Sequence, residues 1–487
     1  MRSGARERSL LLEVLRSSAF LVGTELATRA VSLLTTLYLA RTLARDGVGL
    51  VESGLALFAV LQVASGGGVE ALFTSEAARH RGDVPRLAGR ALVISWLLLA
   101  VVLLGLGTIA ALIGVSRELV TIAVPFSIAA AFLPLGLRFA HIADQRAPIL
   151  GTSLLVSFVV YFTGCLLLVR DPTDALRVGA CWAGATIVRV AVLHATYRRH
   201  HGRITFDRRG LGPSIRRTVE LGIGSGARGL QLSLDVLLLG LLAAPDEVGP
   251  YALATKLPLL LASFATFVYI ALSPALVRAA AAGEHARLAA IQADTLDAVL
   301  VVAVPGVVAL GMVAEPLAVA LFSERFRIAA PSLALLLWRV PLLAAGGALR
   351  TVIWARDPTT DARIATTVLV VTLLGLPIAA ARGAQATAWC MLAADGLALA
   401  LCLRCAERPA FGPAPGALLV RLGAGMAVAA GLARLAAGAV PVVAVTGTLG
   451  AWGVAAVVAG YPHLRRVARE VAPHAAGRAP SSPSHDV

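Results

Sequence analysis

Charge is what this sequence has little of. Of its 487 residues, 15% are Asp, Glu, Lys or Arg, while 58% are hydrophobic and the mean hydropathy is +0.82. A soluble globular domain carries roughly 25% charged residues, so the composition excludes that class and indicates a membrane protein. Lysine is almost absent, because Lys256 is the only one and arginine supplies the rest of the positive charge.

Cysteine is also sparse, and motifs for metal, nucleotide or covalent chemistry are missing. Cys402 and Cys405 have CxxC spacing, but no second pair and no nearby histidine accompany them, which argues against a zinc or redox centre. The stretch GSGARG (224–229) satisfies GxGxxG. It lies in an apolar run with no preceding strand, so we do not assign a dinucleotide site. We expect no catalytic residues, no metal and no cofactor, and a protein that is not an enzyme.

Long apolar runs are what the sequence does contain. About fourteen runs have the roughly 20 residues that cross about 30 Å of hydrocarbon. They predict helices, because a helix satisfies its own backbone hydrogen bonds in lipid. Their approximate ranges are 17–40, 49–72, 91–114, 119–142, 148–169, 176–197, 219–243, 251–277, 295–322, 329–355, 362–381, 383–404, 415–436 and 439–461.

The net charge of +15 reflects membrane topology rather than nucleic-acid binding. Arginines gather in alternate loops, mainly within residues 2–16, 79–90, 198–217 and 465–469, as the positive-inside rule predicts. We therefore expect a multi-pass protein of the cell inner (cytoplasmic) membrane with both termini in the cytoplasm and no nucleic-acid partner. The first span is interrupted by Glu25 and Arg29 and is expected to stay uncleaved.

One turn occurs twice in this chain. ARDGVG (44–49) and APDEVG (244–249) share Ala, Asp, Val and Gly in register, and each joins the first and second spans of a block of six. An even number of crossings separates the copies, so both turns face one side of the membrane and the blocks are parallel repeats. Asp favours a helix boundary and Gly a tight reversal, so we expect the turn to be structural.

The fold expected is therefore all-α, a polytopic membrane protein with two parallel six-helix bundles around a central cavity and an additional C-terminal helix pair. The expected divisions of the chain are 1–210, 211–410, 411–462 and a disordered cytoplasmic tail at 463–487, which is rich in Pro, Ser and Ala.

Both copies of the turn lie in stretches that resemble a known family. YLARTLARDGVGLVESGLALF (38–58) is similar to the first hairpin of bacterial polysaccharide and oligosaccharide flippases of the MATE-like MOP superfamily. DVLLLGLLAAPDEVGPYALATKL (235–257) is similar to their seventh-to-eighth hairpin. The resemblance implies a carrier of lipid-linked glycans in the membrane, with a glycan polymerase and glycosyltransferases as possible partners. The last pair of spans departs from the commoner twelve-span pattern. A total of fourteen spans resembles the lipid II flippases, so a lipid II flippase is the alternative.

Charged side chains inside apolar spans are the candidate site residues, because an ionised group at the bilayer centre costs about 2.5–3.5 kcal/mol. Basic groups in a water-filled cleft suit the phosphate or pyrophosphate of a lipid-linked sugar. The candidates for substrate binding are Arg29, Arg228, Arg339, Lys256 and Arg350, and those for ion coupling are Glu25 and Asp235. For each arginine a buried structural ion pair is the alternative, and the spacing of Glu25 and Arg29, one helical turn apart, predicts that they neutralise each other. Arg228 and Asp235 are expected on one face of the seventh span.

Two other functions are alternatives to a glycan flippase. A multidrug cation antiporter of the same fold requires unpaired acids in its cavity, whereas the intramembrane charge here is more basic than acidic and favours an anionic substrate. A membrane-embedded glycosyltransferase or polymerase requires a sizeable extramembrane loop, and the loops between these spans are short.

Overall fold

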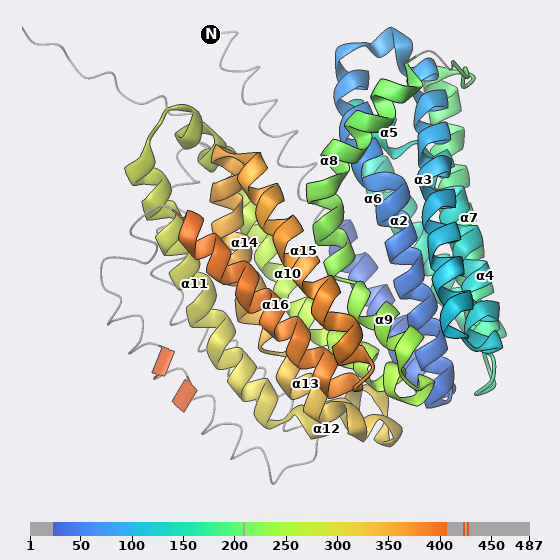
Figure 1. Cartoon of the computed structure of the whole chain (residues 1–487), viewed down its shortest axis with the longest axis vertical. Helices are drawn as coiled ribbons and strands as arrows, with labels where there is room; N and C mark the ends of the chain where they lie inside the picture. Colours follow the sequence, from blue (N-terminus) through green and yellow to red (C-terminus); the bar gives the residue numbers. More distant parts are fainter. Residues whose placement is uncertain (1–22, 208–209, 407–421, 424–425, 428–487) are drawn as a thin grey trace, which may run out of the picture.

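The computed structural model describes residues 23–207, 210–406, 422–423 and 426–427, and in this part of the chain it contains helices and turns but no strand (Figure 1). The first half forms a helix at residues 23–42, α2 (Arg45–Arg79), η1 (Arg81–Asp83), α3 (Val84–Ile113), α4 (Arg117–Phe132), η2 (Leu133–Gly136), α5 (Arg138–Ala143), α6 (Ala147–Leu168) and α7 (Ala175–His201). The second half forms α8 (Leu211–Gln231), α9 (Leu234–Leu242), α10 (Pro245–Ala281), α11 (His285–Met312), α12 (Ala314–Phe322), η3 (Glu324–Ala329), α13 (Ala330–Leu336), α14 (Arg339–Arg356), α15 (Pro358–Ala380) and α16 (Ala384–Cys405).

Ten of the described helical segments are long and apolar enough to cross a membrane. The helix at residues 23–42 and the pair α8–α9 occupy the two further spans expected before residue 405. The expected spans 415–436 and 439–461 lie outside the described residues, apart from a few positions between 422 and 427, and so does the tail at 463–487. The protein is a multi-pass, all-helical membrane protein.

The seventh span differs from the expectation of one continuous helix over 219–243. The chain breaks between α8 and α9 at Leu232 and Ser233, where Ser233 adopts a non-helical φ of −132° and becomes the N-cap of α9. Asp235 therefore lies in the first turn of a helix, where an acidic side chain is favoured by the helix dipole. Arg228 and Asp235 consequently belong to two different helices, and they bind different partners, Asp361 and Arg339.

The two copies of the repeated turn meet at one end of the molecule. A Cβ atom built at Gly249 would lie 2.6 Å from the carbonyl oxygen of Arg45, and one built at Gly49 would overlap the carbonyl oxygen of Pro245. The contact is reciprocal, as between parts related by a two-fold axis. It puts both turns at the same end, here called the hairpin end, and only glycine permits this approach of α2 and α10.

The helices form two groups in space, which we call the first bundle (residue 23 to α7) and the second bundle (α8 to α16). Figure 1 shows the first bundle on the right and most of the second on the left, with α8 and α9 between them. Away from the hairpin end, α2 also crosses α8 closely, since a Cβ at Gly222 would lie 3.2 Å from the backbone nitrogen of Gly68. Gly68, Gly224 and Gly229 thus lie at close helix contacts, because a Cβ at each would meet a neighbouring helix at 2.7 Å or less.

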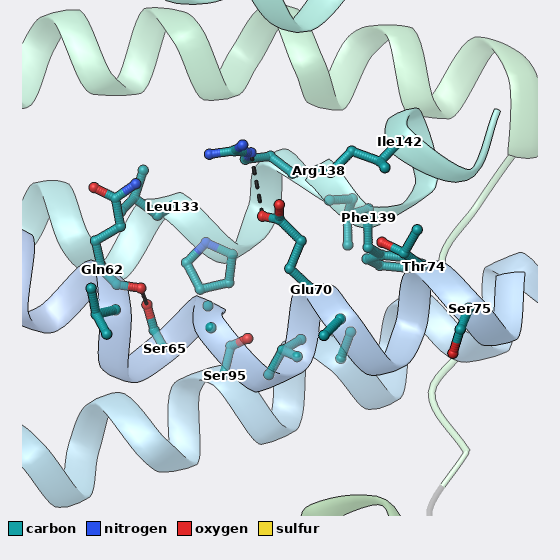
Figure 2. A pocket seen from close by; sticks show the side chains of 18 of the residues that line it. Gln62, Ser65, Glu70, Thr74, Ser75, Ser95, Leu133, Arg138, Phe139 and Ile142 are labelled. Atoms are coloured by element: carbon teal, nitrogen blue, oxygen red, sulfur yellow. Dashed lines mark hydrogen bonds and ion pairs between the residues drawn. The ribbon is translucent and has the colours of Figure 1, made fainter. Parts of the chain in front are cut away.

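Three of the cavities among the described helices have volumes of 350 Å³ or more. One of about 690 Å³ lies inside the first bundle, between α2, α3 and the η2–α5 segment (Figure 2). A second of about 700 Å³ lies between α2, α3, α4 and α9 and is lined by small and aliphatic side chains. A third of about 350 Å³ lies inside the second bundle, between α10, α11 and α14.

The start of α15 is fixed by a carboxylate cap. Asp357 accepts hydrogen bonds from the hydroxyls of Thr359 and Thr360, both at 2.6 Å, and from the backbone N–H of Thr359. These bonds stabilise the ionised carboxylate and lower the pKa of Asp357 to about 2. The cap is therefore ionised throughout the neutral pH range, and it holds the helix that carries Asp361.

Candidate functional site

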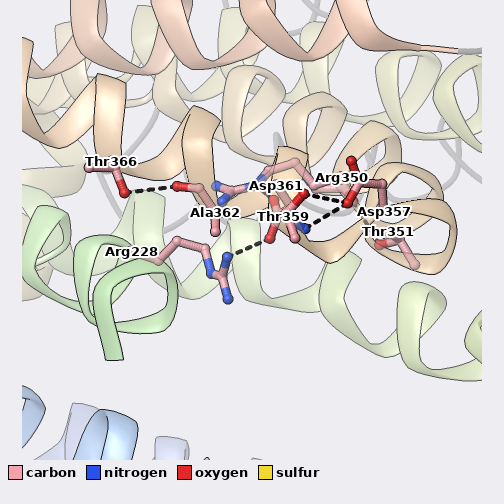
Figure 3. A network of polar contacts seen from close by, with 9 residues as sticks. Arg228, Arg350, Thr351, Asp357, Thr359, Asp361, Ala362 and Thr366 are labelled. Carbon is pink, nitrogen blue, oxygen red and sulfur yellow. Dashed lines mark hydrogen bonds and ion pairs between the residues drawn. The ribbon is translucent and has the colours of Figure 1, made fainter. Parts of the chain in front are cut away.

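The arginines Arg228 and Arg350 converge on one carboxylate, that of Asp361 (Figure 3). Arg228 Nη1 on α8 lies 2.5 Å from Asp361 Oδ2, and Arg350 Nε on α14 lies 2.7 Å from Asp361 Oδ1. The side chains are 38% exposed for Arg228, 21% for Arg350 and 6% for Asp361. We call these three residues the open network, because both arginine side chains retain exposed surface.

Close helix packing makes the open network possible. A Cβ at Gly224 of α8 would lie 2.6 Å from the Cβ of Ala362 on α15, so the two helices touch one turn away from Arg228. The network holds two positive charges and one negative charge. In addition, the buried Nη2 of Arg350 has no hydrogen-bond partner, so a donor and a net positive charge are left for an anion.

A second ion cluster, here called the closed triad, joins Arg339 to Asp235 and Asp395. Arg339 Nε lies 2.6 Å from Asp395 Oδ2, and its Nη1 lies 3.6 Å from Asp235 Oδ2. All three side chains are at most 2% exposed. The Tyr251 hydroxyl donates to Asp235 at 3.0 Å, and the Gln231 amide donates to Asp395 at 3.5 Å. The triad thus ties α8, α9, α10, α14 and α16 together within the second bundle.

The remaining basic candidates each have one acidic partner. Lys256 Nζ on α10 lies 2.6 Å from Glu52 Oε2 on α2, which links the two bundles through an ion pair whose acid is buried. Arg29 Nη2 lies 2.7 Å from Glu25 Oε1 one helical turn away, and both side chains are more than a third exposed. This i,i+4 pairing is the neutralisation that the spacing predicted.

The sequence prediction missed the acids that organise these clusters. Asp361, Asp395 and Glu52 bind bases that lie far away along the chain, on other helices. A signal was present for Asp395, which interrupts the apolar run 383–404 as Arg339 interrupts 329–355. Asp361 gave a weaker signal, because it precedes its apolar run by one position.

The repeated turn has structural contacts, as its sequence suggested. The carboxylate of Glu247 accepts the backbone N–H of Ala384 at 3.1 Å, which satisfies a free donor at the first turn of α16. Gly249 makes the close contact with α2 described above. Tyr251 and Lys256, which follow in the same stretch, bind Asp235 and Glu52. The stretch 235–257 therefore supplies polar contacts within the second bundle and an ion pair with α2.

Residues 14–280 match the family described as "Polysaccharide biosynthesis protein". This chain belongs to that family. The part of this family member that matches includes both copies of the turn, Arg228 of the open network, and the pair Lys256–Glu52. A search of curated proteins found no match.

Two solved structures share the fold of this polysaccharide biosynthesis family member. One is described as "Lipid II flippase MurJ, inward closed conformation", with a TM-score of 0.73 and 11% identity over 90% of this chain and 98% of that one. The other is an inward-facing multidrug resistance MATE family transporter of the MOP superfamily, with a TM-score of 0.53 and 16% identity over 80% of this chain and 95% of that one. The fold is therefore that of the MOP superfamily.

Proposed function

We propose that the protein is a flippase that moves a lipid-linked oligosaccharide or polysaccharide precursor across the cytoplasmic membrane, for cell-envelope or exopolysaccharide biosynthesis. Family membership supports the pathway, and the fold supports a carrier rather than an enzyme. The observation on which the proposal rests is the open network, in which two arginines share one carboxylate and stay partly exposed inside an apolar protein.

The open network suits a phosphate or diphosphate group. A guanidinium donates two parallel hydrogen bonds to phosphate oxygens, and it remains charged at any physiological pH. Arg228 and Arg350 would bind this group together, while the lipid tail of the substrate stays in the bilayer. Arg29 and Lys256, each about a third exposed, are proposed as further contacts for the anionic head group as it moves.

Arg339 has a different proposed role in this conformation. Its side chain is 1% exposed and is held by two carboxylates, so it would bind substrate only after the triad opens. We propose that it holds the second bundle as one unit. Asp235 and Glu25 are the proposed coupling groups, and Asp235 would exchange a proton or ion when the bundles rearrange.

Alternating access would use the contacts between the bundles. The approach of Gly49 and Gly249 closes the hairpin end, and the pair Lys256–Glu52 joins α10 to α2. Rocking of one bundle against the other would exchange this closed end for an open one. From the arginine-rich loops, we propose that the hairpin end faces away from the cytoplasm and that both termini are cytoplasmic.

Reconstitution tests the function. Purified protein in liposomes should transfer a fluorescent undecaprenyl-diphosphate-linked oligosaccharide between leaflets faster than protein-free liposomes do. Transport of lipophilic cations under an ion gradient, without transfer of the glycolipid, would instead establish a multidrug antiporter. Selective transfer of lipid II over other glycolipids would establish a lipid II flippase. Co-purification with a glycan polymerase or glycosyltransferase would identify the proposed partners.

A further inference from the structure

The cavity inside the first bundle has a polar wall that no step above uses. Figure 2 shows Gln62, Ser65, Glu70 and Thr74 of α2 on one side and Arg138 of α5 opposite them. Arg138 Nε lies 3.5 Å from Glu70 Oε2, an ion pair with both side chains 38% exposed. The cavity volume of about 690 Å³ is in the range of sites for small molecules.

Polar groups at this cavity are left without hydrogen bonds. The buried Nε of Arg138 lies at ion-pair distance from Glu70 but makes no hydrogen bond, and the buried hydroxyl of Thr74 makes none either. Buried polar groups are nearly always satisfied. Arg138 and Thr74 therefore keep donors for a bound anionic or hydroxylated ligand.

The second bundle shows that the fold does not require a polar wall here. In the repeat register, Gln62 corresponds to Ala262, Ser65 to Ala265 and Glu70 to Ile270. The cavity at the corresponding part of α10 is lined by Leu261, Phe264, Ala265, Val268 and other mainly apolar side chains. At these positions the two bundles therefore differ, and the polar side chains of α2 are a feature of the first bundle rather than of the shared arrangement of helices.

Arg138 and Arg350 also lie near the same end of the molecule. Arg138 begins α5, the last segment of its crossing, and Arg350 lies in the last two turns of α14. Both crossings run away from the hairpin end. The first-bundle cavity and the open network therefore lie on the side opposite the hairpin end, one in each bundle.

We propose that the first-bundle cavity is a second binding subsite, for an anionic saccharide, and that it takes the glycan part of the substrate whose phosphate meets the open network. Arg138 binds the anionic group of the sugar. Glu70, Gln62 and Thr74 bind hydroxyl groups, because a carboxylate accepts from two hydroxyls and an amide both donates and accepts. This inference rests on the proposed flippase function.

Filling the cavity is the first test. Gly66 lines it, and a Cβ at this position meets nothing within 4 Å, so Gly66→Leu should fold and should strengthen α2 as a helix. Gly105→Leu on α3 is the matched control, because Gly105 also has free space and is exposed outside the cavities. The probe is glucuronosyl diphosphate on a ten-carbon prenyl chain, whose sugar carries a carboxylate, with binding measured in detergent. We expect at least tenfold weaker binding for Gly66→Leu and no change for Gly105→Leu; equal affinity of the two variants would overturn the proposal.

Charge selectivity is the second test and separates this subsite from the open network. Arg138→Gln should weaken binding of this probe at least tenfold without changing the affinity for the matching glucosyl diphosphate, whose sugar is neutral, and Arg138→Lys should restore part of the loss. Arg216→Gln, on an exposed pair of α8, should leave both affinities unchanged. An equal loss of affinity for both probes, or a loss for neither, contradicts an anion site at Arg138.

Different results would disprove the subsite and the flippase function. If the wild-type protein transfers the lipid-linked glycan but Gly66→Leu and Arg138→Gln do so at the wild-type rate, the subsite is wrong and the flippase stands. If the wild-type protein neither binds the probe nor transfers the glycolipid, the proposed function itself is wrong.

Discussion

The open network and the closed triad are built from the same two residue types but differ in exposure and charge. The open network has two arginines and one aspartate and carries a net positive charge, with Arg228 38% exposed. The closed triad has one arginine and two aspartates, and no member is more than 2% exposed. Ions in a low-dielectric interior need partners, and the triad supplies them from within, whereas the open network leaves capacity for an anion from outside.

The difference shows why a charge inside an apolar span is not by itself a binding site. Arg339 and Arg228 both interrupt an apolar span in the sequence. Only their acidic partners in the structure distinguish a structural arginine from an exposed one. Both aspartates of the triad also accept hydrogen bonds from Tyr251 and Gln231. Nη2 of Arg339, like Nη2 of Arg350, has no hydrogen-bond partner, but it belongs to a cluster that is at most 2% exposed and has two acids to one base, so an anion from outside does not reach it in this conformation. If the comparison is right, substitutions in the triad should act on folding, and substitutions in the open network should act on substrate.

The largest effect is expected at Arg339. Arg339→Leu leaves two buried carboxylates without their cation, and breaking a buried pair in this way costs about 3–5 kcal/mol. The variant should lose most of its folded population in detergent, as measured by size-exclusion chromatography and thermal unfolding followed by tryptophan fluorescence.

A compensated variant sharpens this result. Replacing all three charges together, by Asp235→Leu, Arg339→Met and Asp395→Leu, should recover most of the folded population, because no buried charge is then left unpaired. An Arg339→Leu protein that is as stable as the wild type but does not bind the glycolipid would instead show that Arg339 belongs to the binding site.

An intermediate effect is expected at Asp361. Asp361→Asn removes the charge that neutralises two guanidinium groups, and leaving such groups unsatisfied costs about 1–3 kcal/mol. Thermal unfolding should begin at lower temperature. Affinity for the anionic probe should stay equal or rise, since the carboxylate competes with the ligand for the same donors. A fall in affinity with unchanged stability would mean that Asp361 contacts the substrate directly.

Substitutions of the open-network arginines should affect binding more than folding. The double variant Arg228→Gln and Arg350→Gln should bind the diphosphate-linked probe at least tenfold more weakly, which corresponds to about 1.4 kcal/mol. Its thermal unfolding should stay closer to the wild type than that of Arg339→Leu. Isothermal titration in detergent measures the affinity, and Arg216→Gln on the same helix α8 is the control.

The smallest effect on stability is expected for the pair Glu25–Arg29. Both side chains are more than a third exposed and the pair is an i,i+4 pair on one helix, which contributes about 0.3–0.5 kcal/mol. Glu25→Gln should leave thermal unfolding almost unchanged. Because Glu25 is a proposed coupling group, the same variant should reduce the dependence of the transfer rate on an imposed proton gradient. An unchanged dependence would show that Glu25 is not a coupling group.

Much of the architecture could be predicted from the sequence, because hydrophobic length and the repeated turn are local signals. In the described part of the chain the apolar runs between 23 and 404 coincide with helical segments, and the turns at 44–49 and 244–249 meet at one end. The break at Leu232–Ser233 was not predicted. No proline marks it, and Asp235, which follows it, makes tertiary contacts with Tyr251 and Arg339 that helical periodicity does not show.

The pairing of charges could be predicted only where the partners are close in sequence. Helical spacing identified Glu25–Arg29, but Arg228 with Asp361 and Lys256 with Glu52 are joined across helices distant in the chain. No periodicity within one helix carries that information. The polar cavity at Glu70 and Arg138 was missed for the same reason, since its two walls come from α2 and α5.

The most direct test of the central claim is the rate at which a fluorescent undecaprenyl-diphosphate-linked oligosaccharide crosses the membrane of proteoliposomes. The account predicts rapid transfer by the wild type and by Arg216→Gln, and at least tenfold slower transfer by the double variant Arg228→Gln and Arg350→Gln inserted at the same density. Transfer by the double variant at the wild-type rate would contradict the claim that the open network binds the anionic head group.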